Sequence, residues 1–220
     1  MDIWLDTTAT PLIQYAFKLG ILSGVTTNPS IIANSNKSPE EIIESLLHYQ
    51  EGPITVQVVA EDVMDMVQQG QNLHAISNRI IIKVPATKNG LEAIRLLSRQ
   101  GISTMATVIF TARQALMASL VGADYVALYI NRIEQSGNDP WIILSSIIQM
   151  YDNYKIKTKI LGASICSVEQ VTKCAELGIY GVTLKDGIFQ QLIADHPLTT
   201  ECVSNFNEDW KKSTALSLVL

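Results

Sequence analysis

One lysine lies inside the most apolar stretch of the sequence. The stretch from Arg79 to Gly90 reads RIIIKVPATKNG, so Lys83 follows three isoleucines. A continuous run of β-branched residues is typical of a strand that is covered on both faces, and lysine is almost never fully buried without a partner or a function. Burial lowers the pKa of an ammonium group. It would leave a neutral amine that can attack a carbonyl carbon and form a Schiff base.

Two structural interpretations of Lys83 compete with this chemistry. The side-chain stem could lie along apolar surface while the ammonium reaches water, or the ammonium could form a structural ion pair with Asp6. The residue types alone favour the Schiff base over these two by a small margin.

Polar residues also lie at or near the ends of other short apolar runs. They are Asp6 after IWL, Thr26 and Asn28 in GVTTNPS, Gln57 in TVQVV, Thr107 in MATVIF, Tyr129 and Arg132 in VALYINR, and Ser164 in GAS. Any one of them could be a buried polar side chain with a satisfied hydrogen bond. If several of them converge on one end of a sheet, a polar site is the better explanation.

The apolar runs alternate with helical patterns along the chain. Strands are predicted at residues 3–5, 24–26, 55–59, 80–84, 103–108, 125–129, 159–163 and 181–184. The helical period covers SPEEIIESLLHY, EDVMDMVQQGQNLHAIS, GLEAIRLLSRQ, TARQALMASL, DPWIILSSIIQMY and SVEQVTKCAEL. In the first of these segments Ser38 is the predicted N-cap, Pro39 the first helical residue and Glu41 the partner in a capping box.

Eight strands alternating with helices predict an α/β fold, a closed (β/α)8 barrel. No Pro-, Gly- or Ser-rich linker interrupts the chain, so residues 1–220 are predicted to form one domain. The alternative is an open doubly wound sheet, but that fold usually has a glycine-rich turn after its first strand, and here the first strand ends in LDTTAT. In a barrel, catalytic groups lie at the carboxyl ends of the strands.

The charge of the chain argues against some partners. The net charge is −5, the pI is about 5.2, and no basic patch suggests nucleic acid. The densest basic stretch, Lys155, Lys157 and Lys159, is expected to be a solvated strand face. No apolar run approaches the length of a membrane span.

Other features of the composition indicate the setting of the protein. The start, MDIWLDTT, lacks the apolar region of a secretory signal. The cysteines Cys166, Cys174 and Cys202 match no zinc or redox spacing, so free thiols in a reducing cytoplasm are expected. Apolar residues make up 47% and charged residues 17% of the chain, a balance that favours a homo-oligomer.

Several motifs together carry a resemblance that covers essentially the whole chain. They are LDT, GVTTNPSII, KVPAT, GADYVALYINRI, GAS and FNEDWKK, in that order. With them the sequence resembles the small transaldolase-like aldolases, which include fructose-6-phosphate aldolases, within the wider transaldolase family. GVTTNPS and the IxKVP strand are specific motifs rather than effects of composition.

The resemblance implies a class I aldolase that requires no metal or organic cofactor. Lys83 would form the Schiff base with fructose 6-phosphate, and cleavage would release dihydroxyacetone and glyceraldehyde 3-phosphate. A transaldolase would instead pass the three-carbon unit to an acceptor such as erythrose 4-phosphate. The resemblance also implies proton transfer by Asp6, positioning of a catalytic water by Gln57, Thr107 and Tyr129, contacts to substrate hydroxyls by Asn28 with Thr26 beside it, and phosphate binding by Arg132 and Ser164.

Tyr129 is the position that separates the two activities in this resemblance. Transaldolases typically carry phenylalanine there and fructose-6-phosphate aldolases carry tyrosine, so the sequence ALYINR favours the aldolase, with transaldolase as the alternative. A third hypothesis is a catalytically silent barrel that binds sugar phosphates. The intact set from Asp6 to Ser164 argues against it.

Two positions depart from the pattern of the family. Lys185 follows Leu184 where relatives usually have proline; it could bind phosphate or alter substrate preference, but exposure to solvent is expected. Ile165 and Cys166 occupy the place where relatives often have a basic residue, which could weaken phosphate binding. Cys166 is not expected to be a nucleophile, because no histidine is near it in the sequence.

The tail from about residue 199 to 220 is predicted to be an extra C-terminal helix. By the resemblance it packs on a neighbouring subunit in a decamer made of two pentamers. The alternative is a helix that closes the bottom or side of its own barrel. The expected partners are thus a small sugar phosphate and further copies of the chain, with no nucleic acid and no membrane.

Overall fold

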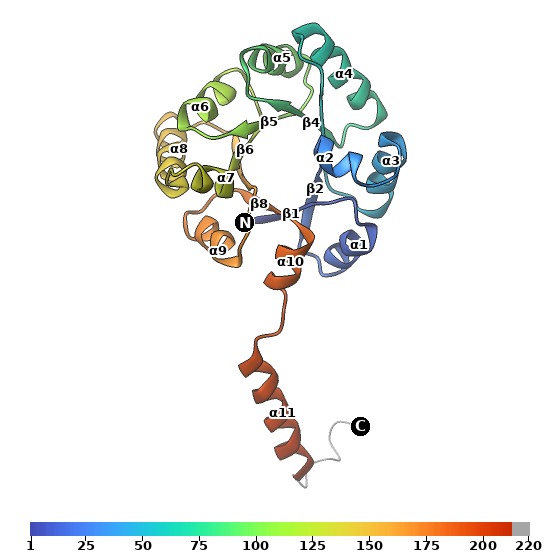
Figure 1. Ribbon diagram of the computed structural model, residues 1–220, viewed down its shortest axis with the longest axis vertical. Helices are drawn as coiled ribbons and strands as arrows, with labels where there is room; N and C mark the ends of the chain where they lie inside the picture. Colours follow the sequence, from blue (N-terminus) through green and yellow to red (C-terminus); the bar gives the residue numbers. More distant parts are fainter. Residues whose placement is uncertain (213–220) are drawn as a thin grey trace.

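Eight parallel strands close into a barrel in the computed structural model, which describes residues 1–212 (Figure 1). Each strand pairs with its neighbours in the sequence, and β8 pairs with β1. The strands are β1 (Asp2–Asp6), β2 (Leu22–Thr26), β3 (Ile54–Gln57), β4 (Ile80–Pro85), β5 (Thr104–Ile109), β6 (Tyr125–Tyr129), β7 (Lys159–Ala163) and β8 (Gly181–Leu184). The predicted (β/α)8 barrel is confirmed.

Helices follow each strand and surround the barrel (Figure 1). They are α1 (Thr10–Lys18), α2 (Pro29–Ala33), α3 (Pro39–Tyr49), α4 (Val63–Ile76), α5 (Lys88–Arg99), α6 (Ala112–Leu120), α7 (Ile130–Gln135), α8 (Pro140–Tyr154), α9 (Val168–Glu176), α10 (Asp186–Leu192) and α11 (Pro197–Lys212). Four of these helices were not predicted: α1, α2, α7 and α10. The short α2 and α7 follow β2 and β6 directly, and their few turns leave no clear period.

The start of α3 follows the predicted capping box. The backbone N–H of Glu41 donates to Ser38 Oγ over 3.2 Å, and the backbone N–H of Ser38 donates to Glu41 Oε2 over 2.9 Å. Thr87 caps α5 in a similar way, since Gly90 donates its N–H to Thr87 Oγ1 over 3.0 Å. That cap fixes the turn directly after β4, the strand that carries Lys83.

The larger hydrophobic core lies between the strands and the surrounding helices. It joins strand residues such as Leu5, Ile82 and Leu128 to helix residues such as Leu46 and Ile94. Successive side chains of a strand point to opposite faces, so the intervening residues of the same strands point into the barrel.

A smaller core fills the lower part of the barrel interior. Its buried members all lie on strands, and they are Trp4, Ile81, Met105, Tyr125, Ala127, Leu161 and Ala163. Gly24 leaves room for the indole of Trp4, because a Cβ atom at this position would lie 2.7 Å from two atoms of the Trp4 ring. The interior is therefore packed and is not a pore.

The inward face of several strands changes from apolar to polar toward the carboxyl end. Asp6 comes two residues after Trp4, Lys83 two after Ile81, Thr107 two after Met105, and Tyr129 two after Ala127. The period of two along each strand thus places these four side chains above the smaller core, at the same end of the barrel.

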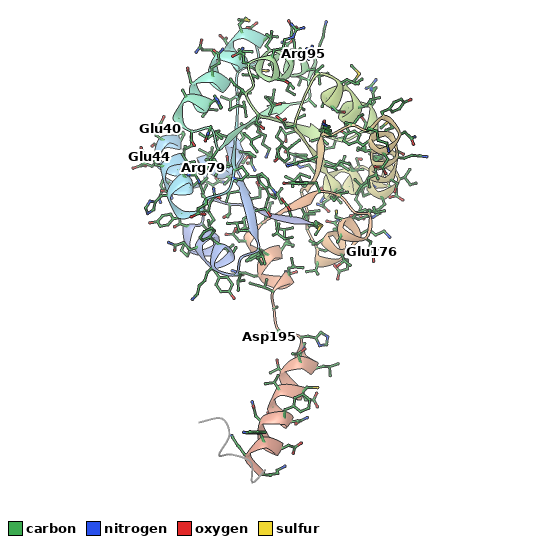
Figure 2. The ribbon with its side chains drawn as sticks, turned by 180° about the vertical axis from the view of Figure 1, so that it is seen from behind. Glu40, Glu44, Arg79, Arg95, Glu176 and Asp195 are labelled. Carbon is green, nitrogen blue, oxygen red and sulfur yellow. The ribbon has the colours of Figure 1, made fainter. Side chains whose placement is uncertain are left out.

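Arg79 fixes the opposite end of β4, on the side of the barrel next to α3 (Figure 2). Its guanidinium donates to the carbonyl oxygens of Leu47 and Gln50, over 2.6 and 2.7 Å, at the C-terminal end of α3. These carbonyls have no partner within their own helix, so Arg79 ties α3 to the start of β4.

The last described helix, α11, extends away from the barrel beyond a connection that contains Asp195 (Figures 1 and 2). It begins at Pro197, slightly before the predicted start, and the predicted part from residue 213 to 220 lies outside the described residues. None of the residues of α11 is buried. Within residues 1–212, the helix therefore does not close its own barrel.

The end of β3 differs from the prediction. β3 ends at Gln57 rather than at residue 59, because the N–H groups of Val59 and Ala60 donate to Gln69 Oε1 on α4, over 3.0 and 3.2 Å. The side chain of Gln69 thus takes the place of a ladder partner.

Lys155, Lys157 and Lys159 are exposed, as predicted, but they do not share one strand face. Lys155 ends α8 in a left-handed conformation, and only Lys159 belongs to the strand. The Lys159 ammonium lies 4.4 Å from the ring centre of Tyr180 and 5.1 Å from that of Tyr125. Attraction between the cation and the faces of these rings explains its position.

The three cysteines are free, as predicted, and Cys174 is buried. Burial raises the pKa of the Cys174 thiol to about 12, so this side chain is an inert part of the core. Among the described helices, none has the length and apolar character needed to cross a membrane.

Candidate active site

A cavity of about 600 Å³ opens at the carboxyl ends of the barrel strands. Seven of the nine predicted site residues line it, and these are Asp6, Asn28, Gln57, Lys83, Tyr129, Arg132 and Ser164. The other two, Thr26 and Thr107, are fully buried beside it and hydrogen-bond to residues that line it. The structure thus brings these nine side chains together at one end of the barrel.

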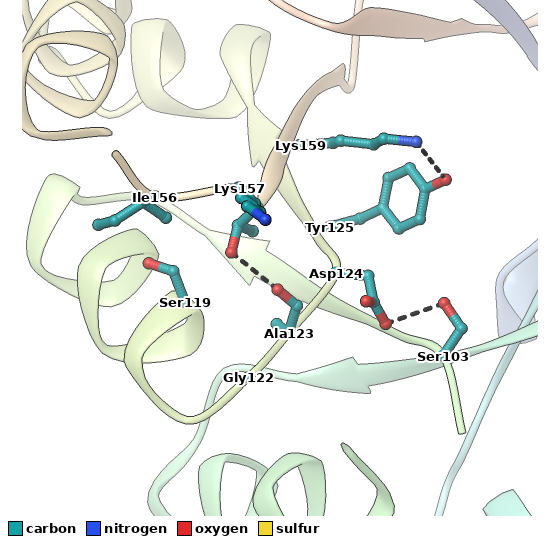
Figure 3. A pocket seen from close by; sticks show the side chains of 10 residues that line it. Ser103, Ser119, Gly122, Ala123, Asp124, Tyr125, Ile156, Lys157 and Lys159 are labelled. Atoms are coloured by element: carbon teal, nitrogen blue, oxygen red, sulfur yellow. Dashed lines mark hydrogen bonds between the residues drawn. The ribbon is translucent and has the colours of Figure 1, made fainter. Parts of the chain in front are cut away.

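A second hollow, of about 440 Å³, lies at the opposite end of the strands (Figure 3). There Ser103 donates to Asp124 over 2.9 Å and Lys159 donates to Tyr125 over 3.3 Å, as Figure 3 shows. These groups bond to each other at the starts of β5, β6 and β7. Polar residues at the amino end of a barrel contribute to stability rather than to catalysis.

Lys83 is buried at the base of the large cavity, with 3% of its surface exposed. Its ammonium donates to the carbonyl oxygen of Thr27 over 3.0 Å. Burial lowers the pKa of Lys83, and the nearby negative charge of Asp6 opposes this shift only in part. A lysine in this state has a larger neutral fraction at neutral pH than a solvated one, and the neutral amine is the nucleophile.

Neither structural interpretation of Lys83 agrees with this geometry. The side chain does not extend along the surface to water, because it is buried. Within residues 1–212 the ion pairs closer than 4 Å join Lys173 to Glu176 and Lys212 to Asp209, and neither involves Lys83 or Asp6.

A chain of hydroxyl groups holds the carboxylate of Asp6. Thr26 Oγ1 donates to Asp6 Oδ1 over 2.7 Å, and Thr26 Oγ1 also lies 2.7 Å from Thr183 Oγ1. A hydroxyl has one proton to donate, so Thr183 must donate to Thr26. Both threonines are buried, and this fixes the orientation of the carboxylate near Lys83.

The phenol of Tyr129 is held on three sides. Its oxygen lies 3.2 Å from Thr107 Oγ1, and its ring packs edge-on against Phe110 with 5.7 Å between the ring centres. The guanidinium carbon of Arg132 lies 5.4 Å from the centre of the Tyr129 ring. Tyr129 thus connects the buried Thr107 with a cation on the wall of the cavity.

Asn28 presents one side of its amide to the cavity. Its Oδ1 accepts a hydrogen bond from the N–H of Ile31 over 3.0 Å, which caps α2. The amide nitrogen is the part that remains to donate to a ligand.

Sequence comparisons place this chain among known proteins. The profile of the family described as Transaldolase/Fructose-6-phosphate aldolase matches residues 3–218. The chain belongs to the transaldolase/fructose-6-phosphate aldolase family. It is an enzyme of the aldolase or transaldolase type, and the family implies a sugar phosphate as its small-molecule partner.

The relatives with curated names in this family are similar over their full lengths. The chain is 37% identical over 213 residues to a protein of Thermoanaerobacter sp. (strain X514) named "Probable transaldolase", covering 97% of this chain and 98% of that one. A protein of Coprothermobacter proteolyticus with the same name is 38% identical over 212 residues, covering 96% and 97%.

Solved structures outside the transaldolase/fructose-6-phosphate aldolase family share only the fold. A flavocytochrome b2 mutant with benzoylformate superimposes with a TM-score of 0.61 at 13% sequence identity, over 84% of this chain and 56% of that chain. A mandelate oxidase mutant superimposes with a TM-score of 0.56 at 15% identity, over 83% of this chain and 62% of that chain.

Ten residues that line the cavity were not among the predicted site residues. Six of them are polar or charged: Ser30, Asn34, Asn131, Gln135, Thr183 and Lys185. Thr183 is a polar residue on the inward face of β8, so the alternation that identified Lys83 could have identified it. Lys185 was expected to point to solvent; it is exposed and it also lines the cavity.

Two residues that line the cavity have a left-handed backbone conformation. Val108 has φ = 61° and Ser164 has φ = 56°. Such a conformation is costly for a β-branched residue and persists only where the surrounding structure holds it. At Val108 the pairing of β5 with β6 is irregular, and at Ser164 the carbonyl oxygen accepts from the N–H of Asn131 over 3.2 Å.

The lowered pKa of Lys83 predicts a pH dependence of stability in this enzyme. The unfolded chain binds more protons than the folded one between the lowered pKa and about 10.4. The free-energy cost of burying a charged Lys83 is therefore largest below the pKa of Lys83 in the folded protein. It disappears as the pH rises toward about 10.4. The measurement is the free energy of unfolding of Lys83→Met and of the wild type in denaturant at several pH values. We expect the advantage of the variant over the wild type to be largest near pH ~6 and to shrink toward pH ~10.

The matched control for this prediction is Lys88→Met, which removes an exposed lysine from the same stretch of sequence. Its effect on the free energy of unfolding should vary little over the same range. A difference for Lys83→Met that stays constant with pH would show that the pKa of Lys83 is not lowered by folding.

Proposed function

We propose that this chain transfers a dihydroxyacetone unit between sugar phosphates, as a transaldolase, with Lys83 as the Schiff-base lysine. The observation that carries the proposal is a buried amine with a lowered pKa at the base of a cavity that also contains Asp6. The names of the curated relatives support the transaldolase as the activity.

The proposed reaction begins with attack of the Lys83 amine on the C2 carbonyl of fructose 6-phosphate. Loss of water gives an iminium, which can accept an electron pair. Removal of the proton from the C4 hydroxyl then breaks the C3–C4 bond, so that glyceraldehyde 3-phosphate leaves and the electron pair forms an enamine. The enamine carbon attacks the aldehyde carbon of an acceptor such as erythrose 4-phosphate, and water releases the new ketose and the free amine.

Asp6 is the proposed acid and base for the proton steps. Its carboxylate lies close enough to influence the pKa of Lys83, and the bond from Thr26 fixes its orientation. A positioned carboxylate typically contributes about 10²- to 10⁴-fold to such a reaction. Gln57 is the direct neighbour of Lys83 in the pairing of β3 with β4. With Thr107 and Tyr129, it is proposed to position the water that forms and hydrolyses the iminium.

The remaining predicted residues are proposed to bind the substrate. The free amide nitrogen of Asn28 is suited to donate to a sugar hydroxyl, and Thr26 supports this region through Asp6. Arg132 and Ser164 follow β6 and β7 and line the same part of the cavity. A guanidinium fork matches the geometry of a phosphate.

Fructose-6-phosphate aldolase, the activity that the sequence ALYINR favours, is the second candidate. The observation in its favour is Tyr129, whose hydroxyl lies in the cavity beside Thr107. Water attached to this phenol would hydrolyse the enzyme-bound fragment and release free dihydroxyacetone. The names of the curated relatives favour transfer to an acceptor instead.

The experiment that separates the two activities uses fructose 6-phosphate with and without erythrose 4-phosphate. A transaldolase forms glyceraldehyde 3-phosphate at a substantial rate only when the acceptor is present. Equal rates with and without acceptor would contradict the transaldolase and support the aldolase.

We predict that Tyr129→Phe raises the ratio of transfer to hydrolysis by about tenfold, the effect of one hydrogen bond to a reacting water. The ratio is measured as product ketose formed per free dihydroxyacetone released. Thr107→Val removes the neighbouring hydroxyl and serves as the matched variant. An unchanged ratio in Tyr129→Phe would place the discriminating group elsewhere.

We also propose that the chain forms a homo-oligomer through α11. This helix carries Val203, Phe206 and Trp210 with 51%, 70% and 45% of their surfaces exposed, and positions 203, 206 and 210 lie on one face of a helix. A decamer and a cytoplasmic location stay predictions of the sequence.

A further inference from the structure

Lys185 follows directly after β8 and lines the same cavity as Arg132 and Ser164. Arg132 comes shortly after β6 and Ser164 directly after β7, and β6, β7 and β8 are neighbours in the barrel. The three side chains therefore form an arc on one wall of the cavity. Phosphate sites of (β/α)8 barrels frequently lie at the loops after strands 7 and 8.

The ammonium of Lys185 is available to a ligand. The side chain is exposed, and within residues 1–212 the ion pairs are Lys173–Glu176 and Lys212–Asp209, so Lys185 takes part in neither. Asp6 is the one carboxylate among the described residues that line the cavity, and it accepts from Thr26. The chain as a whole has a net charge of −5. The wall that carries Arg132 and Lys185 is therefore more positive than the average surface of the chain.

The position of Lys185 relative to Lys83 fits a long substrate. In the closed order of eight strands, β8 is separated from β4 by three strands on either side. A substrate attached to Lys83 at one end thus directs its far end across the cavity, toward the wall formed by β6, β7 and β8.

The segment after β7 does not supply a second cation. Ile165 is buried with 3% of its surface exposed, and the Cys166 thiol donates to Asn131 Oδ1 over 2.9 Å. Arg132, after β6, and Lys185, after β8, are the basic residues that line the cavity on the two sides of Ser164.

We propose that Lys185 binds the phosphate of the substrate together with Arg132 and Ser164, and that it sets the preference for phosphorylated over unphosphorylated aldehydes. This inference rests on the proposed function, since it assumes a sugar phosphate joined to Lys83. Lysine is a compact charge on a flexible stem, so its contribution is to affinity rather than to the exact orientation of the phosphate.

The test compares Lys185→Gln, Lys185→Arg and the wild type with erythrose 4-phosphate and with erythrose as acceptors. We expect Lys185→Gln to raise KM for erythrose 4-phosphate about tenfold, the lower end for a charge-assisted hydrogen bond. KM for erythrose and kcat with either acceptor should stay within about twofold. Lys185→Arg keeps the charge and should restore most of the affinity for erythrose 4-phosphate.

The matched control is Lys157→Gln, which removes an exposed lysine at the opposite end of the barrel, beside the hollow of Figure 3. It should leave KM for both acceptors unchanged, which separates a local contact from the loss of overall charge. Equal KM values for erythrose 4-phosphate in Lys185→Gln and the wild type would overturn the proposal. An equal rise with both acceptors would overturn it too.

Calorimetric titration with inorganic phosphate tests the site without catalysis. The wild type should bind phosphate more tightly than Lys185→Gln by a similar factor, and Lys157→Gln should match the wild type. If no transfer or cleavage occurs in the wild type but this difference in Kd is present, the proposed function fails while the anion site stands. If the enzyme is active and the Kd values are equal, the role of Lys185 alone fails.

Discussion

The Lys83→Met variant is expected to lose activity on fructose 6-phosphate by about 10⁴-fold or more, because removal of a covalent nucleophile eliminates the pathway itself. Methionine has a similar length and no amine, and the site is buried, so the fold should persist. The measurement is the rate of glyceraldehyde 3-phosphate formation with erythrose 4-phosphate present, together with a circular dichroism spectrum to verify the fold.

The control for this variant is again Lys88→Met. Lys88 lies five residues further along the chain, at the start of α5, and does not line the cavity. This variant should retain nearly full activity. A folded Lys83→Met protein with normal rates would exclude the Schiff base at this position, and the hypothesis of a silent sugar-phosphate-binding barrel would apply if the wild type were inactive as well.

The second large effect is expected from Asp6→Asn. The change removes the group proposed to transfer protons and should lower kcat by about 10²- to 10⁴-fold. It also removes the negative charge that raises the pKa of Lys83. Asp6→Asn should therefore shift the acid limb of the profile of kcat/KM against pH to lower pH, because the amine of Lys83 loses its proton more readily.

Thr26→Val provides the matched variant for Asp6. It removes the 2.7 Å hydrogen bond to Asp6 Oδ1 but keeps the carboxylate. Loss of one such bond should reduce kcat by about tenfold, with little shift of the acid limb. A rate for Asp6→Asn within a few-fold of the wild type, or an acid limb that does not move, would show that another group transfers the proton.

The strand pattern was sufficient to predict the barrel and most of its polar cavity. Asp6 lies two residues after Trp4, and Lys83 lies two residues after Ile81. The smaller core and the polar residues above it therefore belong to the same inward faces of the strands. This is why a lysine inside an apolar run predicted a functional group. The convergence of Asp6, Lys83 and Tyr129 followed from the closure of the sheet.

The support of these residues depends on contacts between strands that are far apart in the sequence, and it was not predictable from the sequence. Thr183 on β8 reaches Asp6 through Thr26 on β2, and no local pattern indicates that these three residues meet. The left-handed backbone of Val108 is equally hidden, because valine disfavours that conformation. Only the surrounding tertiary structure holds it there.

The remaining differences arise where a side chain replaces a backbone partner or where an element extends alone. Gln69 ends β3 by accepting from two backbone N–H groups, and the exposed Lys159 places its ammonium over two tyrosine rings. The tail was correctly predicted as a helix as far as Lys212. A single sequence indicates neither its direction nor its partner.

Borohydride trapping tests the central claim about Lys83 most directly. The wild type is treated with fructose 6-phosphate and sodium borohydride, which reduces an iminium to a stable amine, and the intact mass and the peptide map are then compared with those of Lys83→Met. We predict one adduct per chain, on the peptide that contains Lys83, and none in the variant. An adduct on another lysine, or no adduct in an active wild-type enzyme, would contradict the assignment of Lys83 as the Schiff-base lysine.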